Sequence, residues 1–247
     1  MELVGVIEQG VPQQAPATSP VRQARIAGLC YLVVIAGGLF AEGFVRASLV
    51  VPGDAAATAQ AIAANETLWR WGLAVHLVYL LPAIVTNVIV CSLFKAVEPR
   101  LARLGLVFAL AGVTIEAASL VYLYVPLAML QDSRALAALG EGQRQAVSYL
   151  AIGVFDTGFG FALLFFAGFC VLLGGLIWRS RLVPRVIGAL MIGAGGCYLV
   201  NTLALLLWPA LSNLLVPWIL LPILPAELSL ALWLAVKGVT AEAPKPG

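Results

Sequence analysis

The sequence predicts an all-α protein, a polytopic bundle of transmembrane helices with six spans and both termini in the cytoplasm. Three observations lead to this fold class. Of the 247 residues, 62% are hydrophobic and only 11% are charged, whereas an ordinary soluble domain is about one quarter charged. The apolar residues gather in runs of roughly 20 or more, the length that a helix needs to cross a bilayer core of about 30 Å. Most of the Lys and Arg residues lie on one of the two sides that these runs separate.

Six apolar runs are long enough to be membrane spans. Charged or turn-forming residues separate each run from the next, so that the chain crosses the bilayer, turns in a short loop and returns. The spans predicted in this way are residues 26–49, 69–94, 103–130, 147–178, 184–208 and 214–236.

The loop after the first span predicts a short surface helix. It begins Val-Pro-Gly-Asp and continues as an Ala-rich stretch. Asp54 is therefore placed to accept a hydrogen bond from the first free backbone N–H groups of such a helix.

The last three spans each have one unusual feature or boundary. The run from Val147 to Trp178 contains a single charged residue, Asp156, and it is long enough to tilt or to project beyond the bilayer. The fifth span follows the arginines of the loop before it. The sixth contains Pro222 and Pro225 shortly before Glu227. It is either a helix that restarts near Pro225, as in transporter binding sites, or a helix with a proline kink that fits the packing.

The orientation follows from the basic residues, because Lys and Arg are retained on the cytoplasmic side in short loops. Ten lie on the side of the two termini and four on the other side. Residues 22–240 then form a single six-helix transmembrane domain. The flanking segments 1–21 and 241–247 are expected to be cytoplasmic tails, the first of them disordered.

Each predicted span carries one polar group near the same depth, roughly 10 to 20 Å from the outer boundary. A charged group at such a depth costs about 2.5 to 3.5 kcal/mol on insertion scales, so these groups are expected to face the bundle interior and to interact. An interhelical hydrogen bond is worth only about 0.6 kcal/mol on average and does not offset that cost. The candidate ligand-binding residues are Glu42, His76, Glu116, Asp156, Glu227 and Asn201.

The motifs of common enzymes are absent from the sequence. No phosphate-binding loop, nucleophile elbow or dinucleotide fingerprint occurs, so we expect no cofactor and assign no catalytic residue. His76 is the only histidine, and we expect no metal site. The basic residues form no patch, which excludes a nucleic-acid partner. The expected partners are the lipid bilayer and a small polar or cationic ligand.

Three segments carry a resemblance to a known family. They are residues 24–62, 158–200 and 226–239, with the patterns L-F-F-x-G, R-S-x-x-x-P-R and E-L-S-L-A-L-W-L. In these the chain resembles the bacterial membrane proteins of domain-of-unknown-function family 4386. The resemblance implies a one-domain, multi-pass protein of the cell membrane and no established catalytic residue. Many members also have an arginine in the third span shortly before the acid, where this chain has Val107 to Leu110, so that Glu116 lacks a cationic partner in its own helix.

Three functions remain open from the sequence. In the first, the polar layer binds or translocates a cation, a proton or a small polar ligand. In the second, the protein is a non-enzymatic interaction or assembly protein, and the polar layer only locks the bundle. In the third, the protein is an intramembrane enzyme on a lipid or isoprenoid-like substrate, in which a carboxylic acid such as Asp156 or Glu116 acts as general acid.

Overall fold

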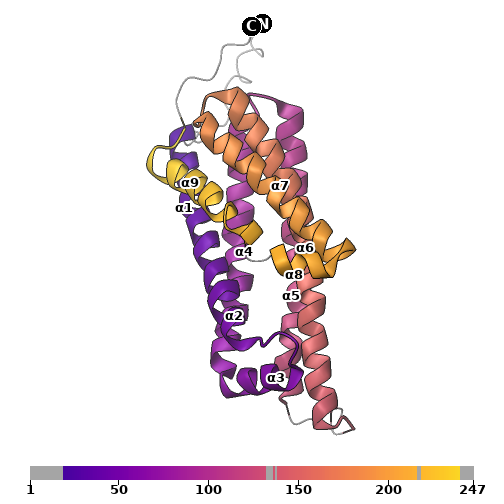
Figure 1. Ribbon diagram of the computed structural model, residues 1–247. Helices are drawn as coiled ribbons and strands as arrows, with labels where there is room; N and C mark the ends of the chain where they lie inside the picture. The colour runs from indigo at the N-terminus through magenta and orange to yellow at the C-terminus, as the bar shows by residue number, and fades with distance from the viewer. Residues whose placement is uncertain (1–18, 132–135, 137, 216–217, 240–247) are drawn as a thin grey trace, which may run out of the picture.

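The computed structural model describes residues 19–131, 136, 138–215 and 218–239. No strand occurs in these residues, and long helices lie side by side along most of the molecule (Figure 1). The predicted all-α class is therefore confirmed. Of the predicted tails, residues 1–18 and 241–247 lie outside the described residues.

Helices make up most of the described chain, joined by short loops. In chain order the elements are α1 (Pro20–Gly38), the π-helix η1 (Leu39–Arg46), α2 (Ala47–Leu49), α3 (Ala55–Ala64), α4 (Glu66–Phe94), α5 (Pro99–Met129), α6 (Glu141–Ser180), α7 (Arg185–Leu207), α8 (Pro209–Leu215), the 3₁₀-helix η2 (Trp218–Leu220) and α9 (Ile223–Val236).

Polar side chains begin several of these helices. The Ser19 hydroxyl accepts a hydrogen bond from the N–H of Arg22 at 3.3 Å at the start of α1. Asp54 accepts one from the N–H of Ala57 at 2.9 Å and begins α3, which confirms the predicted surface helix. These bonds satisfy N–H groups that have no partner in the first turn of a helix. The local sequence thus sets where the helices start.

The long helices pack as a closed ring in the order α1, α4, α5, α6, α7 and α9, with α9 in contact with both α7 and α1. The first turn of α1 and the last turn of α9 meet, since Val21 lies against Gly238. We call this end of the bundle the terminal end and the opposite end, where α3 lies, the α3 end (Figure 1).

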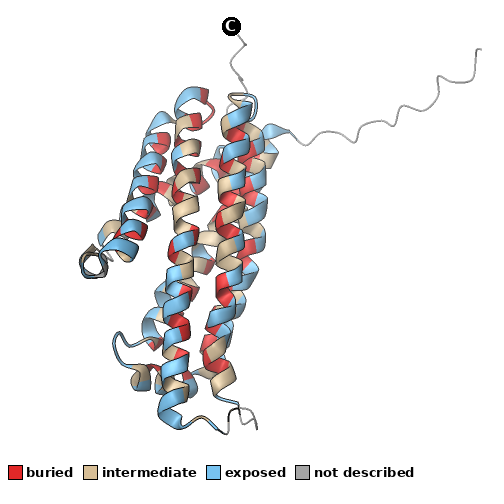
Figure 2. Ribbon diagram, turned by 90° about the vertical axis from the view of Figure 1, so that its right-hand side faces the viewer, coloured by how far each residue is buried: buried red, intermediate tan, exposed pale blue. Residues whose placement is uncertain are grey.

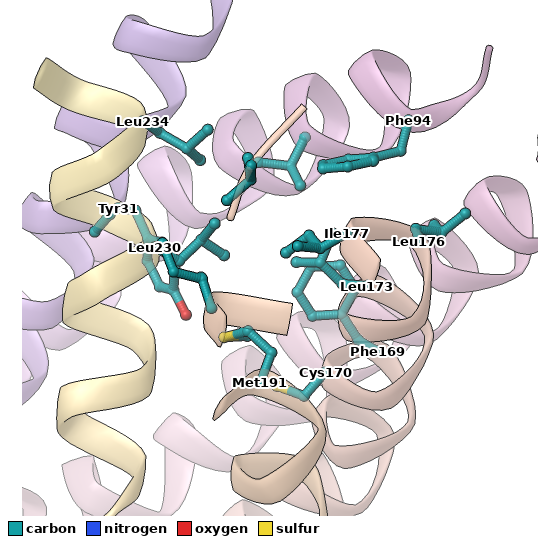
Figure 3. Packing of buried hydrophobic residues seen from close by; sticks show 14 of the residues in the cluster. Tyr31, Phe94, Phe169, Cys170, Leu173, Leu176, Ile177, Met191, Leu230 and Leu234 are labelled. Atoms are coloured by element: carbon teal, nitrogen blue, oxygen red, sulfur yellow. The ribbon is translucent and has the colours of Figure 1, made fainter. Parts of the chain in front are cut away.

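Two apolar cores fill the ring at different heights. Residues of all six ring helices build the core at the terminal end, including Tyr31, Phe94, Met191 and Leu230 (Figure 3). The second core, at the α3 end, draws its residues from η1, α2, α3, α4, α5 and α6 only. Exposed faces point outward along the helices (Figure 2). The bundle therefore has six helices at the terminal end and a four-helix arrangement, closed by α3, at the α3 end.

Five helical segments are long and apolar enough to cross a membrane, as in a multi-pass membrane protein: Pro20–Leu49, Glu66–Phe94, Pro99–Met129, Glu141–Ser180 and Arg185–Leu207. The predicted span 214–236 is not one continuous helix. Its helix, α9, has 14 residues and a length of about 21 Å. Pro222 precedes α9 and Pro225 lies in its first turn, where the missing N–H costs nothing. The helix therefore begins two residues before Pro225.

Gly28 tests the contact that holds α9 in the ring. A Cβ at Gly28 would lie 2.7 Å from the backbone carbonyl oxygen of Ala231, whereas one at Gly38 would meet nothing within 4 Å. We expect Gly28→Ala to lower the free energy of unfolding by about 1–3 kcal/mol, because the backbone of α9 must move. Gly38→Ala, the matched control in the same helix, should leave the melting temperature in detergent unchanged or slightly raised. Equal melting temperatures for the two variants would contradict this packing.

Candidate functional site

The guanidinium of Arg46 joins two carboxylates from different parts of the chain. Its Nη1 lies 2.6 Å from Oε2 of Glu42, and its Nη2 lies 2.5 Å from Oδ1 of Asp156. Glu42 and Arg46 belong to η1, four residues apart, and Asp156 belongs to α6. Only 14% of the Arg46 side chain is exposed, against 48% for Asp156. The arginine is therefore the inner member of the pair and Asp156 lies at its rim.

His76 of α4 continues this chain of polar groups into the bundle. Its Nε2 lies 3.0 Å from Oε1 of Glu116 on α5, and its Nδ1 lies 3.3 Å from Oε1 of Glu42. The hydroxyl of Tyr79 also donates a hydrogen bond to Glu116, at 2.5 Å. Only 1% of the imidazole is exposed. We call these six residues the polar cluster: Asp156, Arg46, Glu42, His76, Glu116 and Tyr79.

The π-helix places both Glu42 and Arg46 in the cluster. In this segment the hydrogen bonds close over five residues instead of four, a rare geometry that occurs mostly as single-turn bulges and frequently at functional sites. Here it extends over 8 residues, Leu39–Arg46. Because η1 is wider than an α-helix, its polar pair can reach inward to His76 while the chain continues into α2.

Aromatic rings enclose the imidazole and the guanidinium. The ring of Tyr79 stacks on His76 with centroids 4.8 Å apart, and the rings of Phe155 and Phe159 approach its edge or face at 5.7 and 6.2 Å. The guanidinium carbon of Arg46 lies 4.7 Å from the centroid of Phe155. These rings exclude water from one side of the cluster, and electrostatic interactions are stronger where water is excluded.

A small cavity opens beside the charged groups. Glu42, Arg46, His76 and Trp69 are among its lining residues, and the space open to the centre of a water molecule is ≈ 10 Å³. That is room for about one water. Three buried atoms of the lining form no hydrogen bond within the described part of the chain: Nε of Arg46, and Oε1 of Glu42 and Nδ1 of His76, which approach each other to 3.3 Å without hydrogen-bond geometry. A single small ligand with donor and acceptor capacity would satisfy them.

The contacts of His76 leave room for one more proton than a neutral imidazole and two carboxylates hold. Both imidazole nitrogens of His76 face a carboxylate oxygen. A neutral imidazole has only one N–H, and an ionised carboxylate can only accept hydrogen bonds. The hydrogen bond between Nε2 and Glu116 suits a neutral imidazole, and a hydrogen bond between Nδ1 and Glu42 as well would take a further proton, on the imidazole or on one of the two glutamates. The three groups that could hold this further proton are Glu42, His76 and Glu116.

Four of the six candidate residues come together in this cluster: Glu42, His76, Glu116 and Asp156. Sequence reasoning missed Arg46, which was counted among the basic residues of the outer loops, and it missed Tyr79. The spacing of Glu42 and Arg46, four residues apart on one helix, is the signal that pointed to a pair. Arg46 pairs with Glu42 and Asp156, whereas Glu116 contacts His76 and Tyr79 and forms no ion pair with an arginine among the described residues.

The other two candidates lie apart from the cluster. Glu227, on α9, accepts a hydrogen bond from the hydroxyl of Tyr198 on α7 at 2.7 Å. Asn201 is buried on α7, and its Oδ1 has no hydrogen-bond partner among the described residues. Glu227 lies at the terminal end of the bundle because α9 does not extend further. The polar groups therefore form two sites instead of one layer.

The resemblance to a family extends over most of the chain. The chain belongs to the family described as domain of unknown function DUF4386, whose model matches residues 26–238. No curated protein and no solved structure matches the chain. The membership predicted from the sequence is confirmed, and it carries no assigned activity.

Arg46→Met tests the centre of the cluster. The variant leaves Glu42 and Asp156 without their cation in a poorly hydrated place, so we expect the free energy of unfolding to fall by on the order of 3 kcal/mol. Arg70→Met is the matched control, because Arg70 forms the exposed pair with Glu66 on α4 and such pairs contribute about 0–1 kcal/mol. The measurement is thermal unfolding in detergent.

The double variant Arg46→Met with Glu42→Gln separates lost attraction from stranded charge. Removing the carboxylate that Arg46 neutralised should recover part of the stability that Arg46→Met alone loses. The effect of Glu42→Gln is therefore measured in the wild type and in Arg46→Met. If it lowers the stability of both proteins by the same amount, the two side chains are not coupled.

Proposed function

We propose that the polar cluster binds a proton or a small monovalent cation in the outer half of a bacterial cell membrane. In this proposal the protein crosses the membrane six times, with both termini in the cytoplasm, and the sixth crossing consists of α9 and the segment before it. The proposal covers binding first and translocation as its extension.

The arrangement of the chain ends supports this topology. Val21 lies against Gly238, so the first and last helices begin and end on the same side of the bundle, as an even number of crossings requires. The loops that carry most of the basic residues, between α4 and α5 and between α6 and α7, join helices at that same end. Basic residues in short loops favour the cytoplasmic side.

The position of His76 carries the proposal. It is almost fully buried and lies between carboxylates from two other helical segments. Histidine is the side chain whose ordinary charge change falls closest to neutral pH. An imidazole between two acids, with a cavity for about one water beside it, has the composition of a site that takes up and releases a proton.

The charge balance of the cluster favours a positive ligand. The cluster contains three carboxylates, of which Glu42 and Asp156 pair with the one guanidinium, that of Arg46, while Glu116 contacts His76. Even with a charged imidazole the set carries one negative charge in excess, and excess charge is costly in apolar surroundings. A bound proton or a monovalent cation neutralises it. In the described part of the chain no group of three His, Cys, Asp or Glu side chains is arranged to hold a metal ion, which disfavours a divalent ligand.

A structural role is the second candidate, because most polar atoms of the cluster are already paired and its cavity is small. In that case the cluster locks α4, α5, α6 and η1 together, and nothing binds reversibly. The two functions differ in whether the cluster responds to added protons and cations.

The single histidine makes this response measurable. In protein labelled with ¹⁵N at histidine, the imidazole signals report on His76 alone. We expect these signals to change between about pH 5 and 8 and on addition of Li⁺, Na⁺ or K⁺, and the melting temperature to rise with the cation that binds. Glu116→Gln should weaken the binding of that cation at least about tenfold, which corresponds to about 1.4 kcal/mol of binding free energy.

Glu66→Gln is the control variant, since Glu66 lies on the same helix as His76 but pairs with the exposed Arg70. It should respond as the wild type does. A wild-type spectrum that stays constant across this pH range and with all three cations, together with a large fall in melting temperature for Glu116→Gln, would replace the binding proposal with the structural one.

A further inference from the structure

A second polar site, partly buried, lies around Glu227 in the half of the bundle towards the terminal end. This residue stands in the first turns of α9, where Oε1 accepts the hydrogen bond from Tyr198 of α7. Tyr31 of α1 interacts electrostatically with the same carboxyl group, and so does the thiol of Cys170 on α6. Tyr31, Tyr198 and Cys170 are thus the titratable groups that face Glu227 from the neighbouring helices.

Glu227 has no positively charged neighbour. Among the described residues it forms no ion pair, whereas Glu42 and Asp156 share Arg46. A carboxylate without a counter-ion in apolar surroundings is far more costly than a neutral carboxylic acid. The surroundings of Glu227 therefore favour a form of the side chain that holds its own proton.

The hydroxyl of Tyr31 is a further polar group that faces Glu227. Only 6% of Tyr31 is exposed, and its hydroxyl finds no hydrogen-bond partner in the described part of the chain. Figure 3 shows this hydroxyl directed into the space between α9 and the helix that carries Met191. An ionised Glu227 could only accept hydrogen bonds, while a protonated one has an O–H to donate. The hydroxyl of Tyr31 can accept from a protonated Glu227 or donate to an ionised one, so it suits both forms, and the missing counter-ion is what favours the protonated form.

The start of α9 places this site away from the polar cluster. Tyr31 precedes Glu42 by eleven residues in the same helical segment, a distance of roughly 16 Å along the axis. Because Pro222 and Pro225 begin the helix inside the bundle, Glu227 lies close to a helix start instead of in the middle of a span. Broken helices of this kind carry ion and substrate sites in transporters.

We propose that Glu227, Tyr31 and Tyr198 form a second proton-binding site, in which the carboxylic acid of Glu227 releases its proton to water and takes it up again. This site does not depend on the function of the polar cluster. Its failure would leave the cluster's binding of a proton or cation untouched, since the two sites share no residue. If both bind protons, the chain holds one proton site in each half of the bundle.

Infrared spectroscopy of the protein in lipid membranes tests this proposal, because a protonated carboxylic acid has a carbonyl band that carboxylates lack. We expect that band in the wild type at neutral pH, a shift of the band in D₂O, and its loss in Glu227→Gln. Tyr31→Phe, which keeps the ring and removes the hydroxyl, should shift the band without removing it. The Tyr31→Phe variant also tests the proposal if Glu227→Gln does not fold.

Two controls keep the assignment specific. Glu116→Gln should retain the band of Glu227, which separates this site from the polar cluster, and Glu66→Gln should retain it as well. The proposal is overturned if Glu227→Gln keeps the full band of the wild type, or if Tyr31→Phe leaves that band unchanged. A band that never shifts in D₂O would also overturn it, because the proton would then be fixed and not exchanged.

Discussion

The guanidinium of Arg46 is the interaction on which the α3 end of the bundle depends. Three carboxylates stand close together there in surroundings that hydrate charge poorly, and their mutual repulsion would separate η1, α5 and α6 without a cation between them. Arginine suits this position better than lysine, because its planar fork binds two carboxylates at once and its face rests on an aromatic ring. Arg46 does both, towards Glu42, Asp156 and Phe155.

The short α9 explains why such a bond is needed between η1 and α6. At the terminal end α9 fills the ring between α1 and α7, with the backbone of Ala231 against Gly28. At the α3 end α9 is absent, and the apolar core there takes no residue from α7 or α9. The ion pair of Arg46 with Asp156 then joins the two sides of the ring directly. The long π-helix, the short last helix and the exposed rim position of Asp156 are parts of one arrangement.

Composition and periodic features of the sequence predicted much of this structure. Five of the six apolar runs became long helices, Asp54 began α3, and four of the spaced polar residues met in one cluster. The errors have physical causes. Arg46 stands near the outer end of the predicted first span and was counted with the four basic residues of the outer side, because position along a helix does not show that a side chain turns inward. Glu227 was assigned to the same layer by counting residues in a continuous span, which the start of α9 at Ile223 makes invalid.

The two sites stabilise acidic side chains inside the bundle in different ways. In the polar cluster a fixed cation, Arg46, offsets most of the negative charge, and His76 provides the group that can change its charge near neutral pH. Around Glu227 the described residues provide no cation, one tyrosine hydroxyl donates to the acid, and the hydroxyl of a second tyrosine has no partner. A purely structural layer needs only acids that are paired with a fixed cation, since a neutral apolar residue at position 227 would pack without any cost of burial. An acid without a cation among the described residues is what favours proton binding over packing.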